Sequence, residues 1–431
     1  MPMCLHPTAG FIPDISRGAM PGPLAGPERE ALRGMARRVR EMSEDPRQAE
    51  RRRLWLLHND LATRRPMLLV FPEDSWTEVI GEDTLALRDP FWRQWEWHLR
   101  HILWRGERLA DDFVVDPELA VPRLLRRGGW GMEPRYRRGG EKGSYVWDAP
   151  VKDPTDLEKV RYPRIAPDDE ATERIAAALQ DAFGDILPIR VSCPVPVVCL
   201  VGEATMLRGL QKVMEDMYDE PGFLHRLMDM IARGLSSDLD LLESGGYLTL
   251  NNGCHYTDSG GIGYTRDLPG PDFVSGPARL RDLWGHGVAQ ELAGVSPAQH
   301  EEFVLEHQLP LLERFGLVAY GCCEPYTRKF DMLKRRVRNL RRVSVSPWCD
   351  VDAAAEALGD RYVFSWKPNP AMLADTFHPD QVRSYIRGTL ERTRRCVVEV
   401  VLKDTFTLGG DPRRLEEWAR IAREEIERVP A

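Results

Sequence analysis

Long apolar runs are missing from the sequence, which has no stretch of about 18 consecutive hydrophobic residues. We therefore expect no membrane-spanning helix and no membrane partner. The amino terminus lacks a charged segment followed by an apolar one, so we expect no secretory signal and a cytoplasmic protein. None of the eight cysteines lies in a Cys-x-x-Cys pair, which argues against a structural zinc knuckle and predicts free thiols.

An excess of positive charge is also missing. Lysine and arginine number 59 against 67 aspartates and glutamates, which gives a formal net charge of -8. This balance argues against a nucleic acid as the main partner and favours a small-molecule substrate. Hydrophobic residues make up 42% and charged residues 29%, as in ordinary globular proteins. A chain of 431 residues can form a single α/β barrel domain with a large core.

The chain divides into two predicted parts. Residues 1–62 comprise a tail rich in proline and glycine, followed by one or two charged helices. Residues 63–431 form the main domain, with an insertion of helices and loops at about 74–165, where tryptophan is concentrated. Tryptophan clusters of this kind usually pack against one another, and only a minority contact a ligand.

Short apolar runs recur along the main domain, and helical patterns separate most of them. The predicted strands are 67–71, 189–193, 247–251, 317–321, 343–346, 362–366 and 397–402. Helix starts are predicted at Ser296-Pro297-x-Gln299, which matches a capping box, and at Asp411-Pro412. Alternating strands and helices indicate an α/β protein with a parallel sheet. We predict a (β/α)8 TIM barrel with an amino-terminal helical extension, and a doubly wound sheet is the alternative.

Polar residues follow several of these strands. In a βα barrel the functional site lies at the carboxyl ends of the strands, so these residues are the candidates for substrate binding and catalysis. The candidates are Glu73, Trp76, Asn251, Tyr264, Tyr320, Cys322, Glu324, Trp348, Lys367, Asn369, Lys403 and Asp404.

The Cys322-Cys323-Glu324 run is the sharpest of these signals. A thiolate and a carboxylate can together bind zinc, and a thiolate of lowered pKa can instead be a nucleophile. The alternative is that the cysteines pack as small apolar groups. Adjacent strand residues point to opposite sides, so both thiols cannot face one site while the strand is regular.

Two lysine-containing segments follow other strands. Lys403 and Asp404 emerge from an apolar run, where charges are costly unless they are paired or used. They are candidates for substrate or acid-base roles, and a salt bridge that closes the barrel is the alternative. Prolines flank Lys367 and Asn369, which suits rigid recognition of an anion or amide, and a plain turn is the alternative.

The segment from Asn251 to Tyr264 contains three glycines in a Gly-Gly-x-Gly loop. Its spacing does not match the dinucleotide-binding fingerprint, so we expect a mobile loop at the barrel mouth. His255 in this loop is a candidate general acid or base. A lone loop histidine is more often simply exposed.

The motifs at the strand ends resemble the uroporphyrinogen decarboxylase superfamily, over roughly residues 180–425. The most specific segments are Tyr320 to Pro325, Ser344 to Trp348, Lys367 to Pro370 and Val398 to Asp404. The superfamily includes the decarboxylase itself and zinc-thiolate methyltransferases that exchange methyl groups with corrinoid proteins. The resemblance implies a TIM barrel and a homodimer. The chain looks like a branch of the superfamily related to the corrinoid-linked zinc methyltransferases.

The sequence departs from the family pattern at informative positions. Tyr320 stands where the methyltransferases have the histidine of a His-x-Cys zinc motif, so only Cys322 carries over. Lys403-Asp404 stands where a second zinc-binding cysteine is expected, and a zinc site would need a replacement such as Glu324. Glu73 stands where the decarboxylases have arginines that hold the propionate groups of their substrate. An acidic barrel mouth would repel a substrate that carries many carboxylates.

Three functions follow as hypotheses. The first is a methyl or one-carbon transferase that uses Cys322, Glu324, Lys403 and Asp404, with Cys322 as a zinc ligand or a metal-free thiolate and Glu324 as a zinc ligand or a base. A corrinoid would then be carried by a separate protein, because the chain has no Asp-x-His-x-x-Gly signature. The second is a metal-free decarboxylase of a small acid that relies on Lys403 and Asp404. The third is a non-enzymatic barrel that binds a ligand.

Overall fold

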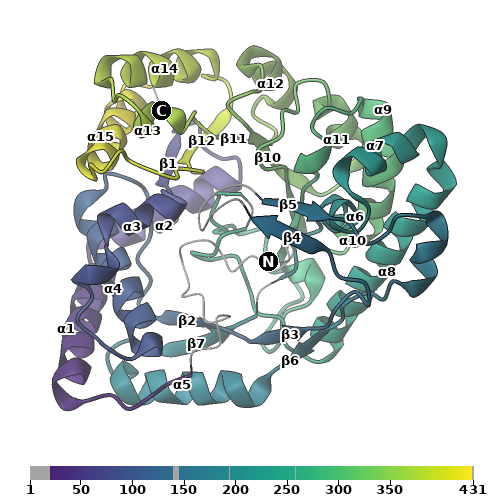
Figure 1. Ribbon diagram of the computed structural model, residues 1–431. Coiled ribbons are helices and arrows are strands. Elements are labelled where there is room, and N and C mark those ends of the chain that lie inside the picture. Colours follow the sequence, from purple (N-terminus) through teal and green to yellow (C-terminus); the bar gives the residue numbers. More distant parts are fainter. Residues whose placement is uncertain (1–19, 139–144, 194, 258, 430–431) are drawn as a thin grey trace.

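The computed structural model describes residues 20–138, 145–193, 195–257 and 259–429 (Figure 1). Most of the predicted amino-terminal tail lies outside these residues. One or two amino-terminal helices were predicted, and two are present, α1 (Gly26–Ser43) and α2 (Pro46–Asn59). In the part of the chain that is described, no helix combines the length and the apolar character needed to cross a membrane.

The centre of the fold is a six-stranded parallel sheet. Its strands, in spatial order, are β1 (Met67–Val70), β12 (Val397–Leu402), β11 (Val363–Trp366), β10 (Leu340–Val345), β9 (Leu317–Tyr320) and β8 (Trp284–Gly287). The first strand of the domain thus pairs with the last one, with Met67 opposite Glu399. The predicted α/β class and parallel sheet are confirmed, and the arrangement is consistent with a barrel.

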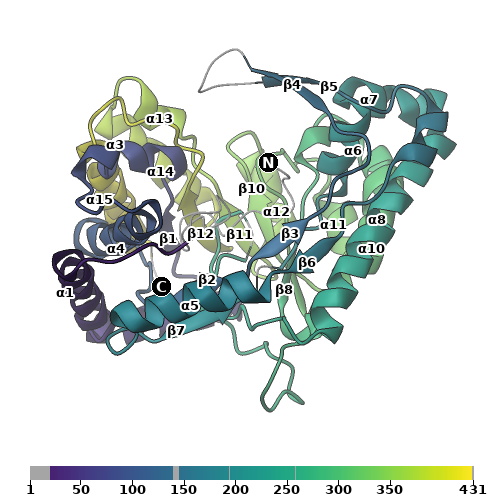
Figure 2. The ribbon, with the colours of Figure 1, turned by 60° about the horizontal axis from the view of Figure 1, so that its bottom comes forward.

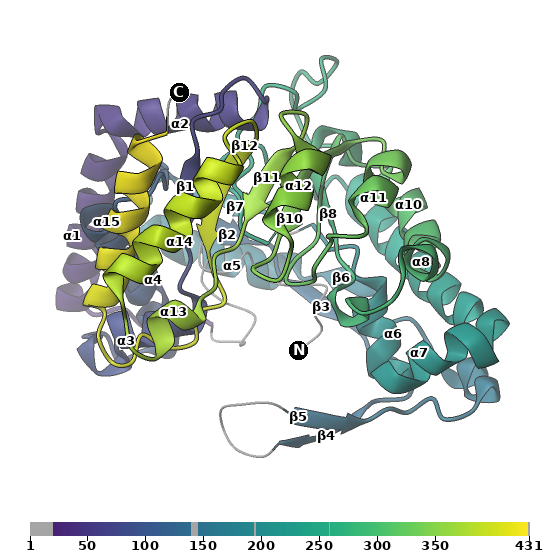
Figure 3. The same cartoon turned by 90° about the horizontal axis from the view of Figure 1, so that it is seen from above.

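Helices follow the strands and cover one face of the sheet (Figure 3). They are α9 (Pro297–His300), α10 (Glu306–Leu312), α11 (Phe330–Arg336), α12 (Val351–Leu358), α13 (Ala371–Ala374), α14 (Pro379–Arg392) and α15 (Arg413–Glu427), with a π-helical turn at Glu301–Leu305. The predicted capping box is confirmed, because Ser296 Oγ accepts a hydrogen bond from Gln299 N. Strand side chains alternate between two cores: Leu68 and Val70 belong to one, and Met67 and Leu69 to the other.

The predicted insertion contains strands as well as helices and loops. It holds α3 (Trp76–Val79), α4 (Pro90–Arg108) and the strands β2 (Leu119–Pro122), β3 (Leu125–Arg127), β4 (Arg135–Arg138) and β5 (Tyr145–Asp148). Strand β2 pairs in parallel with β7 (Ile189–Ser192), β3 pairs with β6 (Ile165–Pro167), and β4 pairs with β5. Helix α5 (Asp169–Phe183) runs along β2 and β7 (Figure 2). This segment is therefore part of the scaffold.

The remaining helices connect β7 to the main sheet. They are α6 (Leu200–Arg208), α7 (Leu210–Asp219) and α8 (Pro221–Ser244). Short 3-10 turns lie at Glu73–Ser75, Glu82–Thr84, Pro154–Lys159, Leu280–Asp282 and Gln290–Leu292.

The prediction of a strand at 247–251 is wrong. The polar side chains of this segment form hydrogen bonds with the backbone of neighbouring segments, and its own backbone is not part of a strand ladder. Thr249 Oγ1 accepts a hydrogen bond from Cys193 N at 3.0 Å. The Asn251 amide accepts from Trp284 N at 2.9 Å and donates to Trp284 O at 3.0 Å. Side-chain bonds of this kind compete with regular secondary structure, and β8, which begins at Trp284, was not predicted.

Candidate functional site

The chain turns sharply as it leaves β9. Gly321 has a φ of +102°, and a Cβ there would lie 2.5 Å from the ring of Tyr326, so glycine is required at this position. Cys322 and Cys323 therefore lie beyond the regular strand, and their Sγ atoms are 3.4 Å apart. The strand alternation that would separate the two thiols does not apply here.

Lys403 brings the ends of three strands together. It directly follows β12 and is 6% exposed. Its Nζ lies 2.7 Å from Asp404 Oδ1, 3.8 Å from Glu73 Oε1 and 4.0 Å from Cys322 Sγ. We call Cys322, Cys323, Lys403, Asp404 and Glu73 the thiol–lysine cluster.

Two further contacts complete the thiol–lysine cluster. Cys323 Sγ lies 3.4 Å from Asp404 Oδ2, and Asp404 N donates to Glu73 Oε2 at 3.1 Å. Glu73 follows β1, Asp404 follows β12, and the cysteines follow β9. The carboxyl ends of parallel strands share one edge of a sheet, which explains how residues far apart in sequence meet.

Charge and hydrogen bonding favour a thiolate at Cys322. The hydrogen bond with Cys323 and the positive charge of Lys403 lower the pKa of Cys322, although burial opposes them. The same hydrogen bond, together with burial, raises the pKa of Cys323. Of the two thiols, Cys322 is therefore the one that loses its proton more readily.

The two charged partners of this thiolate titrate in different ranges. Burial and the neighbouring Asp404 raise the pKa of Glu73 to about 7, against the opposing effect of Lys403. Burial lowers the pKa of Lys403, but Cys322, Glu73 and Asp404 outweigh it and raise the pKa overall. The lysine is thus an ammonium, while Glu73 can both give and accept a proton near neutral pH.

Glu324 supports the loop that carries the thiols. Its carboxylate is 2% exposed and accepts hydrogen bonds from Cys322 N at 2.9 Å, from Ala289 N at 3.2 Å and from the Tyr326 hydroxyl. Ser344 Oγ also donates to Cys322 O at 2.7 Å. Both oxygens of Glu324 are therefore engaged in holding the loop. Tyr326 and Ser344 were not among the predicted site residues, although Ser344 begins one of the segments that carry the family resemblance.

The zinc ion implied by the family resemblance does not fit this donor set. The ammonium of Lys403 already contacts the Cys322 thiol and the Asp404 carboxylate, and it would repel a second cation there. Within the described ranges, no three side chains of His, Cys, Asp or Glu are grouped as a metal site requires. Glu324, the expected replacement ligand, has both oxygens occupied.

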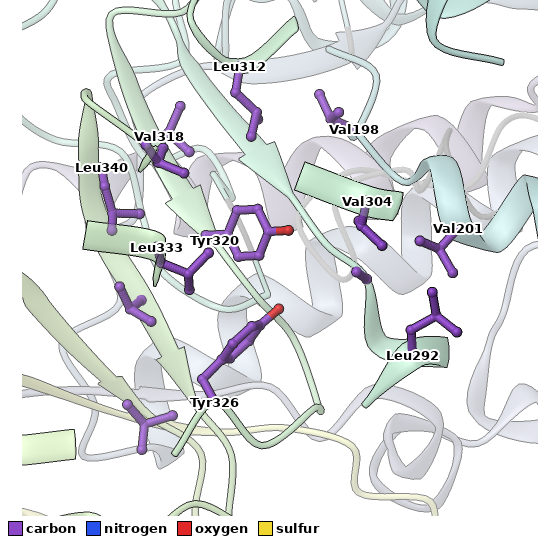
Figure 4. Close-up of a cluster of buried hydrophobic side chains, with 14 of the residues drawn as sticks. Val198, Val201, Leu292, Val304, Leu312, Val318, Tyr320, Tyr326, Leu333 and Leu340 are labelled. Atoms are coloured by element: carbon purple, nitrogen blue, oxygen red, sulfur yellow. The ribbon is translucent and has the colours of Figure 1, made fainter. Parts of the chain in front are cut away.

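Two of the predicted binding residues face the core. Tyr320 is 1% exposed, and its hydroxyl bonds with Gln308 Oε1 at 2.5 Å and His300 Nε2 at 3.1 Å. Figure 4 shows Tyr320 and Tyr326 among buried apolar side chains. Trp76 packs against α4, with its ring centroid 4.3 Å from that of His101. Neither ring has a described contact with the thiol–lysine cluster.

Three predicted binding residues follow β10 and β11. Lys367 Nζ donates to Ser365 Oγ at 2.5 Å and to Ser365 O at 3.2 Å. Asn369 Oδ1 accepts from Ala371 N at 3.0 Å, as in the turn that was the alternative interpretation. Trp348 is 68% exposed.

The loop residues lie in a different part of the fold. His255 Nε2 is 2.8 Å from Arg190 Nη2, and the Tyr264 hydroxyl donates to Asp116 Oδ1 at 3.0 Å. Both residues line a pocket to which no member of the thiol–lysine cluster contributes. Asn251 is bound to the backbone of Trp284.

The fold and the site together define an α/β protein with a thiol, an ammonium and two carboxylates at the carboxyl ends of a parallel sheet. No family model matches the sequence, and no curated protein sequence matches it. Among solved structures, the fold is similar to that of a methyltransferase from Methanosarcina mazei, with a TM-score of 0.47 and 12% sequence identity. The match covers 86% of this chain and 97% of that chain.

Proposed function

We propose that the protein is an enzyme that transfers a methyl or other one-carbon group from a small molecule to an acceptor, with the Cys322 thiolate as nucleophile. The contact of Lys403 Nζ with Cys322 Sγ at 4.0 Å carries this proposal. A thiolate is the nucleophilic form of cysteine, and a fixed ammonium beside it favours that form at neutral pH.

The cluster supplies the groups for a two-step transfer. The thiolate attacks the electrophilic carbon of the donor and forms a carbon–sulfur bond. The bond from that carbon to the leaving group breaks, and the leaving group keeps the electron pair and takes a proton from Glu73. The acceptor then gives its proton to Glu73, attacks the same carbon and releases the thiolate, which returns to its contact with Lys403.

The chemistry of the leaving thiolate narrows the choice of donor. A thiolate leaves readily from a formyl carbon, because the carbonyl can add the incoming acceptor first, whereas a methyl thioether is inert without further activation. Formyl donors are therefore the first to test. A corrinoid on a partner protein and a homodimer remain proposals that rest on the family resemblance.

The test is to trap the covalent intermediate. The protein is incubated with an isotopically labelled aryl formate or trimethylsulfonium, and the labelled peptide is identified by mass spectrometry. We expect the label on Cys322, its loss in Cys322→Ser and its retention in Cys396→Ser, whose thiol is buried near Ala355. Full transfer activity in Cys322→Ser would remove this mechanism.

A decarboxylase is the second candidate, and the placement of Lys403 between two carboxylates favours it. An ammonium 2.7 Å from Asp404 and 3.8 Å from Glu73 can stabilise a developing carbanion, and Glu73 can protonate it. This function predicts that the protein releases carbon dioxide from a small acid. The Cys322→Ser variant should retain this activity, and the Lys403→Ala variant should lose it.

We also infer that the six-stranded sheet belongs to a closed barrel. Beyond β8, Val198 N donates to His286 O at 2.8 Å and Val288 N donates to Val198 O at 3.2 Å. Beyond β1, Asp112 N donates to Leu68 O at 2.8 Å. Asp112, which precedes β2, thus bonds one edge of the sheet, and Val198, which follows β7, bonds the other edge. Because β2 and β7 pair with each other, they link the two edges, as closure of a barrel requires. An experimental structure with two free sheet edges would contradict this.

A further inference from the structure

A pocket separate from the thiol–lysine cluster lies between α4, the segment before β2, β7 and the loop that carries His255. Its polar lining comprises His98, His101, Asp116, Glu118, Arg190, Cys254 and His255. Its apolar lining comprises Ile102, Phe113, Val114, Val115, Leu119 and Ala120. The cavity between these residues has a volume of about 60 Å³ and opens to solvent on one side. Ligand pockets of proteins have this mixture of apolar walls and a few polar groups.

The pocket contains buried imidazoles that have no hydrogen-bond partner in the described part of the chain. His101 is 1% exposed, and neither of its ring nitrogens has a partner there. Nδ1 of His98, which is 2% exposed, and Nδ1 of His255 are also without one. Buried polar groups are hydrogen-bonded in the great majority of cases. A pocket lined by three imidazoles, each with at least one unpartnered ring nitrogen, is therefore suited to a molecule that supplies the missing partners.

The packing of α4 holds these histidines in place. The His101 ring stacks on Trp97 with centroids 5.3 Å apart and an interplanar angle of 25°. The His101 ring also forms a T-shaped contact with Trp76, and the His98 ring forms one with Trp95, with ring centroids 5.7 Å apart. Rings fixed in this way present their nitrogens in a preformed geometry, which reduces the entropy lost when a ligand binds.

The pocket has an outer vestibule. The two spaces share Asp116, Glu118, Arg190 and His255 as lining residues, so these four form the neck between them. Arg190 forms an ion pair with Glu118, and Asp116 accepts a bond from Tyr264. The charge of the guanidinium at the neck is thus already compensated by Glu118, so the neck offers no free positive charge to an anion.

The chemistry of the lining defines the class of ligand. Burial lowers the pKa of His98 to about 3 and that of His255 to about 4, so both are neutral at pH 7. A neutral imidazole offers one donor and one acceptor. Apolar walls would penalise a charged molecule for lost hydration. An uncharged planar ring with a donor and an acceptor matches both the histidines and the walls.

We propose that this pocket binds a small uncharged heteroaromatic molecule, held by His98, His101 and His255 and enclosed by α4 and β2. The site is distinct from the thiol–lysine cluster and does not depend on the function proposed for it.

Titration with three probes of similar size tests this proposal. The probes are 2-pyridone, which is neutral with one donor and one acceptor, benzoate and benzylammonium, and binding is followed by ligand-observed NMR. We expect saturable binding of 2-pyridone, with both charged probes at least about tenfold weaker. His101→Phe, which keeps the ring stack, should weaken 2-pyridone binding about tenfold because hydrogen bonds are lost.

Two further variants locate the site. Ala120→Trp fills the pocket from β2 and should abolish binding, whereas His225→Phe, on the distant α8, should leave it unchanged. Thermal unfolding verifies that each variant is folded. Absence of 2-pyridone binding, tightest binding of benzoate, or full binding to folded Ala120→Trp would each overturn the proposal. Alkylation of Cys322 is measured alongside, and because it does not involve the pocket, the two proposals can fail separately.

Discussion

Asp404 donates its backbone N–H to the carboxylate of Glu73 across 3.1 Å, and both residues have left-handed backbone conformations, with φ of 57° and 44°. Only one other non-glycine residue in the described ranges, Leu61, has a positive φ. Strain of this kind costs about 1–3 kcal/mol per residue and concentrates at functional sites. Its occurrence at two residues of one cluster supports a site in which geometry is maintained at the expense of stability.

The first prediction compares two substitutions at Asp404. Asp404→Gly and Asp404→Ala both remove the carboxylate and keep the N–H that bonds Glu73. Alanine retains the cost of a positive φ, while glycine does not, so Asp404→Gly should be more stable by about 1 kcal/mol. Urea denaturation of both variants measures the difference. Equal stabilities would show that the backbone at Asp404 is not strained.

The second prediction concerns pH and Glu73. The pKa of Glu73 is raised to about 7, so the folded protein holds a proton that the unfolded chain has already lost above its ordinary carboxyl pKa of 4.5. The contribution of Glu73 to stability is therefore fully present below that value and is lost as the pH rises towards about 7. Glu73→Gln should flatten this part of the stability profile. An unchanged slope between wild type and variant would contradict the raised pKa.

The sequence allowed the thiol–lysine cluster to be foreseen in part. Strand β12 has the predicted bounds, and Lys403 and Asp404 follow it directly. The assumption that strand ends converge was enough to place Cys322 and Glu73 near them. The contact between the two thiols was not predicted, because it depends on the left-handed turn at Gly321. A backbone angle of this kind is not visible in a pattern of apolar residues.

Other features depended on tertiary packing that the sequence does not express. Tyr320 is the last residue of β9 and packs in the same buried cluster as Val318, two residues earlier on the strand. Its position shortly before Cys322 had suggested a role in binding. His98 and His101 lie three positions apart on a tryptophan-rich helix, which places them on neighbouring parts of one face. This spacing was the signal in the sequence for the pocket that His98, His101 and His255 line. The many aromatic residues around the two histidines suggested plain packing instead.

The third prediction concerns a charge network inside the main domain. Glu399 lies 3.1 Å from Arg342 Nε and 3.3 Å from His58 Nε2, and all three residues are fully buried. Glu399→Leu removes the buried carboxylate that Arg342 and His58 contact and should cost about 3–5 kcal/mol of unfolding free energy. The double variant Glu399→Leu/Arg342→Met should recover part of this loss. Additive effects in urea denaturation would contradict a direct coupling.

The same network has a pH signature. Burial raises the pKa of Glu399, but Arg342 and His58 outweigh it and lower the value to about 2. The stability that Glu399 contributes is therefore present above the unfolded pKa of 4.5 and is lost as the pH falls towards about 2. The Glu399→Leu variant should lack this acid-induced loss.

The fourth prediction separates support of the loop from the chemistry of the thiol. Tyr326→Phe removes one donor to the buried carboxylate of Glu324 and should destabilise the protein by about 1–3 kcal/mol. Cys322 N still bonds Glu324, so the alkylation rate of Cys322 at pH 7 should change less than twofold. A large change in this rate would assign Tyr326 to the site itself.

The fifth prediction tests which cation holds the thiolate. Lys403→Met keeps the length of the side chain and removes its charge, so the pKa of Cys322 should rise by about one unit or more. The rate of alkylation by iodoacetamide at pH 7 should then fall about tenfold, since only the thiolate reacts. Lys367→Met is the matched control, because that buried lysine follows a different strand and donates to Ser365.

A chelator distinguishes the ammonium from a metal ion in the same assay. If Lys403 alone supplies the positive charge, treatment of the wild-type protein with EDTA leaves the alkylation rate unchanged, because no ligand exchange is involved. If a zinc ion shielded Cys322, the chelator would instead release the thiol and raise the rate. A faster reaction after chelation, with no effect of Lys403→Met, would therefore restore a metal-dependent mechanism in place of the one proposed.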